Sequence, residues 1–491
     1  MGTALQRLTR QLAALALAGC GPGETPRPPS TSLQAEVAVS AEVPTVLHVS
    51  WTTDVPGRSW VEYGRDDLDQ STPITAADTE HAMPVLGLKA GETYHLRAVT
   101  DIDGERHESP TETLQIAPVP DWYGRFSISQ HEPGAAEMTD GYLLVGASVA
   151  IGGEFSDVGS FVAILDGDGD YVWFYDLPPG VGTLSPSISG DRILWDAYDS
   201  YVSDDLATAT ALDLTGHGPA VSTPLPDGHH VAIESEPGET LTYLARDIQT
   251  VSINDQDVTI QTDRIRRKPV GATTEPEEVF TLFDTLQGDF HWPCTHTLEP
   301  HSRTDHPQLY EWTHGNSLIH HDDALYLYTR WTDTLYKIDP DLGEVAWQLG
   351  GPDSDFTQPS GDPVWVSATE SALWSHGHLS QLWDGGLVLF DNGSHRSPKV
   401  SGIAEYRVDE TEMTVEEVFR FDDPLGRYMG AVGDVRKLPG GNYLASWTTW
   451  GELTEITPQG EIVWRASSTA GHATARIHPI SDLYAQLSSQ E

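Results

Sequence analysis

Cysteine and basic residues are scarce in this chain. Its 491 residues contain two cysteines, Cys20 and Cys294, and 27 lysines and arginines against 74 aspartates and glutamates, so the formal net charge is −47. One cysteine near the start and one in the body of the chain provide no disulfide framework. The large negative excess repels the phosphate backbone, which excludes nucleic acid as a partner.

Long hydrophobic runs are also absent. The apolar stretch from 12 to 18 is far shorter than the roughly 20 residues that a membrane-spanning helix needs. It follows Arg7 and Arg10 and leads into Leu-Ala-Gly before Cys20, which is typical of a signal peptide that ends in a lipobox. The sequence predicts a signal peptide over 1–20 and an exported protein whose lipid on Cys20 anchors it to the cell envelope, at the outer membrane or the periplasmic or extracellular surface.

The rest of the chain divides into a linker and two domains. Residues 21–33 are rich in proline and glycine and suit a tether. Residues 34–118 alternate apolar and polar positions in short runs between turn residues, which predicts a small β-sandwich of the fibronectin III or immunoglobulin-like kind. The segment from Leu88 to Tyr94 resembles the tyrosine corner of fibronectin type III domains, in which the tyrosine hydroxyl bonds to nearby backbone.

Residues 119–491 carry a repeat that predicts their fold. A turn followed by a hydrophobic strand recurs, and a spacing of roughly 50 residues favours a β-propeller over helical repeats. We therefore expect an all-β protein in which a six-bladed β-propeller follows the sandwich, with an insertion over 250–312. The six copies begin at Asp140, Gly190, Pro237, Asp322, Gly385 and Gly440.

Three histidines lie at nearly the same distance before these turns. His230, His314 and His378 each precede a residue of the turn by eight positions. Because the first strand of each blade lines the propeller axis, we expect the three side chains to occupy equivalent places and to face one another in the central channel.

An asparagine and an arginine join this cluster. Asn316 lies two residues beyond His314, on the same face of a strand, and Arg330 ends the next strand, which returns toward His314. Three imidazoles could ligate zinc, but a fixed guanidinium repels a metal ion and attracts an anion. The cluster therefore predicts an anion site without a metal, although propeller channels also hold polar side chains that only bind water.

The histidines belong to longer motifs. These are Trp312-Thr-His-Gly-Asn-Ser317, Tyr328-Thr-Arg330, Ile338 to Gly343 with Trp347-Gln-Leu-Gly-Gly351, His229-His230, and His378 followed by Phe390-Asp-Asn-Gly393. Together they resemble the motifs of the bacterial aryl-sulfate sulfotransferases. The resemblance is close over 230–393 and weaker from 120 to the end.

The resemblance implies an enzyme that moves a sulfuryl group from a phenolic sulfate ester to a phenolic acceptor, with no nucleotide sulfate donor and no other cofactor. It also implies that His378 attacks sulfur and carries the group as a transient sulfohistidine. Arg330, His314 and Asn316 would stabilise the charge on the sulfuryl oxygens. His230 would do likewise or exchange a proton with the phenols.

Neighbouring histidines leave alternatives open. His229 and His230 are adjacent, and alternation along a strand sends only one of them inward; the spacing to the turn favours His230. His376 lies on the same face as His378 and is a rival nucleophile, although the spacing to Phe390 favours His378. We expect His229 and His376 to contact substrate.

Other features permit other functions. The segment 291–306 groups Cys294 with four histidines and could bind zinc, but it lacks the spacing of a zinc finger. Asp166, Asp168 and Asp170 resemble the start of a calcium loop that lacks its glycine and closing glutamate, so a blade turn is the better interpretation. A non-catalytic surface propeller that binds a sulfated or phenolic ligand, or a partner protein, remains the alternative to an enzyme.

Overall fold

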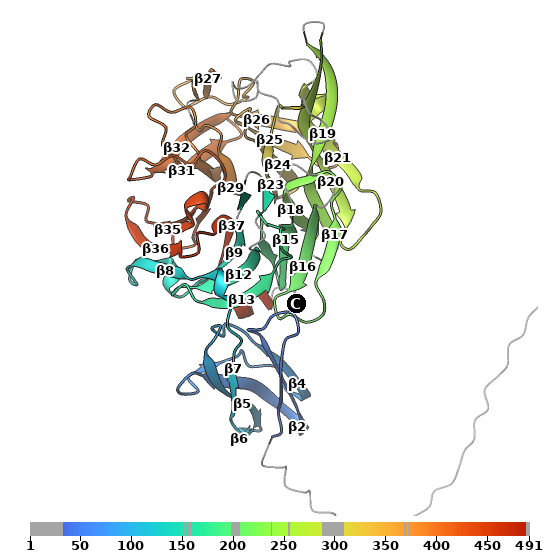
Figure 1. Cartoon of the computed structure of the whole chain (residues 1–491), viewed down its shortest axis with the longest axis vertical. Coiled ribbons are helices and arrows are strands. Elements are labelled where there is room, and N and C mark those ends of the chain that lie inside the picture. Colours follow the sequence, from blue (N-terminus) through green and yellow to red (C-terminus); the bar gives the residue numbers. More distant parts are fainter. Residues whose placement is uncertain are drawn as a thin grey trace, which may run out of the picture.

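The structure is a computed structural model, shown as a ribbon in Figure 1. It describes residues 33–148, 150–151, 154–155, 159–197, 207–236, 238–253, 256–286, 309–367, 370–371 and 373–487. The predicted signal peptide with Cys20, and the segment 291–306 with Cys294, lie outside the described residues. The described chain is almost entirely β, with two short helices, α1 (Leu282–Leu286) and α2 (Leu483–Leu487). No helix in the described ranges has the length and apolar character that crossing a membrane requires.

The first domain is a seven-stranded β unit that is compatible with a small sandwich. The long strand β2 belongs to both layers, because its first half pairs with β1 and β4 and its second half pairs with β3 and β5. The hydroxyl of Tyr94 accepts a hydrogen bond of 3.1 Å from the backbone N–H of Lys89, which is the contact that a tyrosine corner predicts. The strands are β1 (Glu36–Val39), β2 (Leu47–Gly64), β3 (Gln70–Ser71), β4 (Asp78–Val85), β5 (Thr93–Ile102), β6 (Glu105–Glu108) and β7 (Glu112–Gln115).

The second domain confirms the predicted six-bladed propeller. Six sheets of four or five strands follow one another around a central axis. The first blade consists of β9 (Tyr142–Ser148), β12 (Phe161–Asp166) and β13 (Tyr171–Asp176) with β37 (Ala473–Ile480), the second of β14 (Ser187–Ser189), β15 (Arg192–Ala197), β16 (Thr208–Asp213) and β17 (Val221–Pro224), and the third of β18 (Gly228–Glu236), β19 (Thr240–Ile253), β20 (Gln256–Pro269) and β21 (Glu277–Thr281) with β22 (Leu309–Glu311). The fourth blade consists of β23 (Gly315–His321), β24 (Ala324–Thr329), β25 (Thr334–Asp339) and β26 (Glu344–Leu349), the fifth of β29 (His378–Trp383), β30 (Gly386–Asp391), β31 (Gly402–Asp409) and β32 (Thr414–Asp422), and the sixth of β33 (Asp434–Lys437), β34 (Tyr443–Trp447), β35 (Glu452–Ile456) and β36 (Ile462–Ser468) with β8 (Phe126–His131).

Each copy of the sequence repeat contains the second strand from the axis in its blade. These strands are nearly continuous apolar runs because neighbouring blades cover both of their faces; every residue of β30 is buried. Val388 and Phe390 of β30, for example, share a core with Val435 and Trp447 of the next blade. The repeat was visible in the sequence because this position is the most uniformly buried one in every blade.

The ring is closed by strands from both ends of the propeller domain. Strand β37, near the end of the chain, pairs with β9 and supplies the innermost strand of the first blade. Strand β8, at the start of the domain, pairs with β36 and supplies the outermost strand of the last blade. Side chains of β37 therefore enter the centre of the molecule beside the strands of other blades.

Part of the predicted insertion over 250–312 belongs to the third blade itself. Strands β19 and β20 form one long hairpin that pairs from Thr240 with Pro269 to Ile253 with Gln256, and β21 completes the blade. The paired strands extend well beyond the length typical of blade strands, which is why the gap between repeats was so wide. Residues 287–308 lie outside the described residues.

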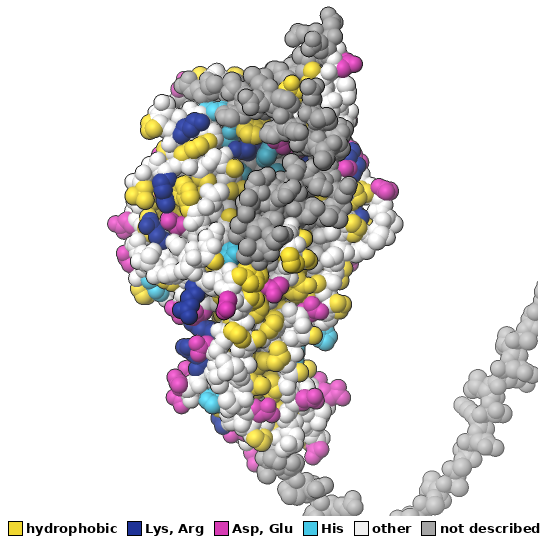
Figure 2. Space-filling model, in the orientation of Figure 1, with side chains coloured by type: hydrophobic (Ala, Val, Ile, Leu, Met, Phe, Trp, Pro, Cys, Tyr) yellow, Lys and Arg dark blue, Asp and Glu magenta, His cyan; other side chains and the backbone are white. Residues whose placement is uncertain are grey.

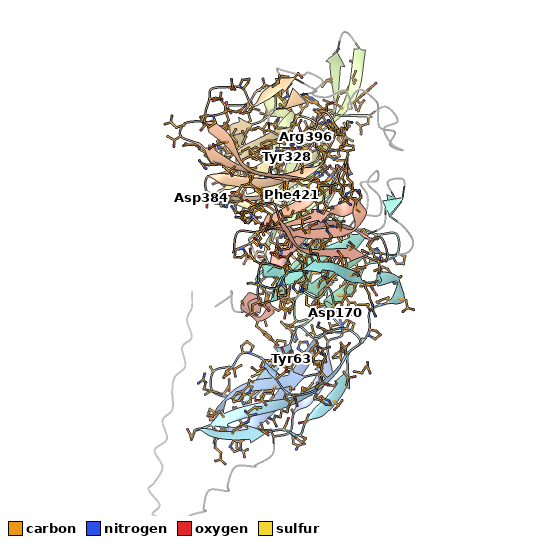
Figure 3. The ribbon with its side chains drawn as sticks, turned by 90° about the vertical axis from the view of Figure 1, so that its left-hand side faces the viewer. Tyr63, Asp170, Tyr328, Asp384, Arg396 and Phe421 are labelled. Atoms are coloured by element: carbon orange, nitrogen blue, oxygen red, sulfur yellow. The ribbon has the colours of Figure 1, made fainter. Side chains whose placement is uncertain are left out.

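The two domains are joined by an apolar core and by one lysine. Val43, Val46 and Leu86 of the first domain share a cluster with Leu144 and Trp173 of the first blade. At the edge of this contact, the Nζ of Lys89 lies 2.8 to 2.9 Å from carboxylate oxygens of Asp166, Asp168 and Asp170, so the blade-turn interpretation of that acidic segment agrees with the structure. Figure 3 shows Asp170 at the end of the propeller that faces the first domain. Acidic side chains elsewhere occur on both domains in the view of Figure 2.

Candidate active site

The predicted histidines surround a cavity of about 410 Å³ in the propeller. Its lining includes an apolar side, with Leu184, Leu309, Ala431 and Val432. A small adjoining void is bordered by Asn316 and Arg476 together with two of the same histidines. The polar residues of the lining are His229, His230, Arg246, Gln261, Glu311, His314, Arg330, His378 and Thr449.

His378 is the first residue of β29, and its ring is held by an amide. Its Nδ1 lies 2.9 Å from the Oδ1 of Asn392. The Nδ2 of Asn392 donates to the carbonyl oxygens of Met429 and Val432, at 2.8 and 2.9 Å. Because these two bonds fix Oδ1 as the acceptor, Nδ1 of His378 must carry the hydrogen, and Nε2 carries the lone pair. Burial, with Arg330 and Arg476 nearby, lowers the pKa of His378 well below its usual range, so the ring is neutral.

His376 does not line this cavity. Its backbone N–H donates to Asp333, and its ring centroid lies 4.4 Å from that of His395 and 4.9 Å from that of Trp331. Asp333, His376 and His395 bring one potential ligand atom each within 4.8 Å of one another. The sequence placed His376 and His378 on one face of a strand; the structure instead begins β29 at His378, and His376 precedes it with a φ of 54°.

The predicted equivalence of His314 and His378 is wrong in register, although both residues line the cavity. Trp383 pairs with Gly386, so the hairpin turn is Asp384-Gly385 and not Gly385-Gly386. In the ladder His376, rather than His378, then matches His314. Both have a left-handed backbone, with φ of 54° and 55°, and both precede a glycine. The spacing was counted from Gly386, which belongs to the strand and not to the turn. A pair of glycines in the sequence does not show which one belongs to the turn.

His229 and His230 form a chain of contacts with a buried carboxylate. The Nδ1 atoms of the two rings are 2.8 Å apart, and the Nε2 of His229 lies 3.1 Å from the Oδ1 of Asp263. Burial, followed by the neighbouring His314, lowers the pKa of His230 well below its usual range. His229, which we expected to contact substrate, borders the cavity and also lies between His230 and Asp263.

His314 and Arg330 enter the cavity from the fourth blade. The Nδ1 of His314 lies 2.7 Å from the Oε2 of Glu311, which also accepts the indole N–H of Trp331 at 2.9 Å. The ring centroids of His314 and His230 are 4.8 Å apart. As predicted from the returning strand, the backbone N–H of Arg330 donates to the carbonyl of His314, at 3.0 Å. The Arg330 guanidinium lies 4.2 Å from the centre of the Trp331 ring and donates to the carbonyl of Gly430.

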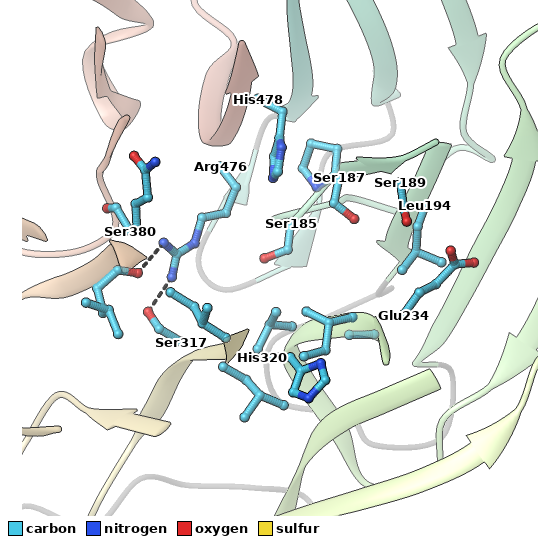
Figure 4. Close-up of a pocket in the computed structure, with 18 of the residues that line it drawn as sticks. Ser185, Ser187, Ser189, Leu194, Glu234, Ser317, His320, Ser380, Arg476 and His478 are labelled. Atoms are coloured by element: carbon cyan, nitrogen blue, oxygen red, sulfur yellow. Dashed lines mark hydrogen bonds between the residues drawn. The ribbon is translucent and has the colours of Figure 1, made fainter. Parts of the chain in front are cut away.

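Asn316 and Arg476 form the floor of the site. Asn316 Nδ2 donates to the carbonyl of Gly377, at 2.9 Å, and thereby joins the fourth blade to the chain before β29. The guanidinium of Arg476, from β37, donates to the carbonyls of Leu379 and Asn316 at 2.6 and 3.0 Å. Figure 4 shows Arg476 above a second cavity of about 360 Å³, between Ser317 and Ser380. Arg476 therefore borders both the small void that adjoins the histidine cavity and this second cavity.

Four residues that contact the predicted site residues were not found from the sequence. Asn392 belongs to the Phe-Asp-Asn-Gly segment, and its place directly after a buried strand was a usable signal. Glu311 precedes His314 by three residues, which is a weak signal. Asp263 and Arg476 reach the site only through the long hairpin of the third blade and the closing strand, and nothing in their local sequence indicates that.

The comparisons with known proteins agree with the motifs. Residues 128–474 match a family model described as Arylsulfotransferase (ASST). No curated protein matches the chain. Among solved structures, a protein of unknown function from Bacteroides caccae is similar with 14% identity and a TM-score of 0.39, over 70% of this chain and 100% of that one. A virginiamycin B lyase from Staphylococcus aureus has 11% identity and a TM-score of 0.30, over 72% of this chain and 99% of that one.

Neither of these structural likenesses carries an argument about function. The family match, in contrast, runs from β8 to β37 and includes every histidine that lines the cavity. The chain belongs to the arylsulfotransferase (ASST) family, and it is therefore a sulfotransferase with an aryl sulfate as donor and a phenol as acceptor.

Proposed function

We propose that the protein transfers the sulfuryl group through a transient sulfohistidine on His378. The observation that carries this proposal is the fixed tautomer of its ring. Asn392 holds the hydrogen on Nδ1, so the lone pair of Nε2 is the one available to a substrate in the cavity. A neutral imidazole with an aimed lone pair is what nucleophilic catalysis at sulfur requires.

In the first step, Nε2 of His378 attacks sulfur and the bond between sulfur and the phenolic oxygen breaks. The electron pair of that bond leaves with the phenolate, and the sulfuryl group stays on Nε2. Negative charge on the sulfuryl oxygens and on the departing oxygen is stabilised by fixed donors. Arg330 supplies a guanidinium that is already held by Gly430 and Trp331. His314 adds a donor only when both of its ring nitrogens carry hydrogen, because its Nδ1 faces Glu311.

In the second step, the oxygen of a second phenol attacks sulfur. The bond between sulfur and Nε2 breaks, and its electron pair returns to the ring of His378. The apolar side of the cavity, with Leu184, Leu309 and Val432, suits the aromatic ring of either phenol, because flat apolar surface gains from leaving water. One cavity thus serves donor and acceptor in turn.

The proposal is tested by mixing the purified protein with 4-nitrophenyl sulfate and a different phenol. We expect nitrophenol release and formation of the second sulfate ester in equal amounts. His378→Ala should abolish both, whereas His376→Ala, which removes an imidazole outside the cavity, should retain the transfer. Transfer that survives in His378→Ala would contradict the assignment of the nucleophile.

We also propose that the protein works outside the cytoplasm on a lipid anchor at Cys20. The leader-like pattern before that residue supports it, and small aryl sulfates suit a compartment that lacks cytosolic nucleotide donors. Cys20→Ser in the full chain should leave the protein without a lipid and shift it from the membrane fraction to the soluble fraction. Unchanged membrane association in this variant would contradict the anchor.

A further inference from the structure

We propose that Asp263 is a positioning residue that makes His230 the proton acceptor for the incoming phenol. This inference rests on the proposed function, because it concerns the second step of that reaction. It adds a carboxylate from the third blade, and a role for His229, to a site otherwise described by the residues that line the cavity.

Asp263 is surrounded by groups that carry hydrogen. The side chain of Asp263 is fully buried. Its Oδ2 accepts the hydroxyl of Thr313 and the backbone N–H of Gly315, at 2.5 and 2.6 Å. The other oxygen, Oδ1, lies 3.1 Å from the Nε2 of His229. A carboxylate oxygen at this distance repels the lone pair of a ring nitrogen and attracts its hydrogen, so we place the hydrogen of His229 on Nε2.

The rings of His229 and His230 continue this chain of contacts. Burial lowers the pKa of His229, so its ring is neutral and its Nδ1 carries the lone pair. That atom lies 2.8 Å from the Nδ1 of His230, which must therefore be the donor. The hydrogen of His230 is thus on Nδ1, and the lone pair of Nε2 is left for the cavity. A carboxylate that orients one imidazole through another selects the tautomer that can act as a base.

The fold is built to admit this carboxylate. Asp263 lies on β20, while Thr313 and Gly315 flank His314 at the start of the fourth blade. A Cβ at position 315 would lie 2.8 Å from the Cγ of Asp263, so only glycine lets the backbone approach so closely. Asp263 therefore fixes the tautomer of His230 and the path of the chain on both sides of His314.

The proton then follows a balanced route. As the phenol oxygen forms its bond to sulfur, its O–H bond breaks and the proton moves to Nε2 of His230. The bond between sulfur and Nε2 of His378 breaks in the same step. His230 becomes an imidazolium and returns the proton to solvent, so the neutral ring is restored before the next acceptor reacts.

Asp263→Asn tests the proposal because it keeps the shape of the side chain and replaces the acceptor that faces His229 by a donor. The amide oxygen can still accept from Thr313 and Gly315, but the amide nitrogen then faces Nε2 of His229 as a donor. The tautomers of both rings reverse, and Nε2 of His230 carries a hydrogen. We expect transfer to unsubstituted phenol to fall on the order of a hundredfold. Transfer from an aryl sulfate other than 4-nitrophenyl sulfate to 4-nitrophenol, much of which is already ionised, should change by less than about threefold.

Two further variants separate positioning from folding. His229→Ala breaks the chain but leaves the bonds from Asp263 to Thr313 and Gly315, so it should show the same dependence on the acidity of the acceptor. The matched control is Asp247→Asn. Asp247 is a buried carboxylate of the neighbouring strand β19 that accepts a hydrogen bond from Gln249, and its variant should show no such dependence. Adding His230→Ala to Asp263→Asn should cause little further loss, since both remove one function.

The outcomes are distinct. The release of nitrophenol in the first half-reaction, measured without acceptor, should survive in Asp263→Asn. An equal loss for acidic and weakly acidic phenols in both Asp263→Asn and His229→Ala would overturn the positioning role while leaving the sulfohistidine proposal intact. Wild-type protein that transfers to no phenol would overturn the proposed function itself.

Discussion

His378 and His314 enter one cavity from neighbouring blades, yet the second nitrogen of each ring meets a different group. His378 donates to the amide oxygen of Asn392, whereas the Nδ1 of His314 lies 2.7 Å from the carboxylate of Glu311. An amide oxygen orients an imidazole without adding charge, while a carboxylate places a negative charge beside it. From this difference we infer separate roles for the two rings, with His378 as the proposed nucleophile.

The largest expected effect tests the two sides of this comparison directly. His378→Ala removes the nucleophile, and transfer should fall by roughly 10⁴-fold to 10⁶-fold, as when catalytic nucleophiles are removed elsewhere. His314→Ala removes an imidazole that lines the cavity beside His230 and should reduce transfer by about a hundredfold to a thousandfold. The check is the steady-state rate with 4-nitrophenyl sulfate and phenol. Equal losses in the two variants would break the comparison.

Arg330 should rank next. Its guanidinium is buried against Trp331 in the lining of the cavity, where we propose that it binds the sulfuryl oxygens, so Arg330→Ala should lower kcat by about a hundredfold to a thousandfold. Arg330→Lys keeps a positive charge but loses the planar fork, so it should recover only part of that loss. Recovery of the full rate by lysine would show that charge alone, without geometry, is sufficient.

Asn392→Asp replaces the amide beside Nδ1 of His378 by a carboxylate. In the wild type the lowered pKa of His378 keeps Nε2 unprotonated, so the rate of the first half-reaction should persist below pH 6.5, the ordinary value for histidine. A carboxylate beside Nδ1 raises the pKa of His378. The acid limb of kcat/KM should therefore move to higher pH in Asn392→Asp. An unchanged profile would mean that the side chain of Asn392 does not control the ring.

The smallest effect is expected away from the cavity. Lys89 meets three carboxylates of the first blade at the domain contact, but partly exposed ion pairs contribute little. Lys89→Ala should lower the free energy of unfolding by less than about 1 kcal/mol, with a smaller difference at high salt and no change in transfer. A large loss of activity would show that the first domain influences the site.

The strand pattern and the repeat predicted the propeller because buried second strands recur with similar spacing. Closure of the ring could not be predicted, since the pairing of β37 with β9 joins residues more than three hundred positions apart and leaves no local signal. Arg476 lies on β37, so its place in the site could not be predicted for the same reason.

The relative positions of the predicted residues agreed with the structure where one hairpin sets them and differed where a loop sets them. The return of Arg330 to His314 followed from one hairpin. The separation of His376 from His378 did not, because it depends on where β29 begins and on a left-handed backbone at His376. Asp263 could not be found, because it is brought to His229 by the pairing of a long hairpin and not by sequence spacing.

The central claim is that His378 carries the sulfuryl group. Wild-type protein should be mixed with 4-nitrophenyl sulfate in the absence of any acceptor phenol, quenched, digested, and analysed by mass spectrometry of the peptide that contains both His376 and His378. The account predicts one added sulfuryl group, with fragmentation placing it on His378, and its loss when phenol is added before the quench. A modification found on His376, or a labelled peptide that phenol does not discharge, would contradict the account.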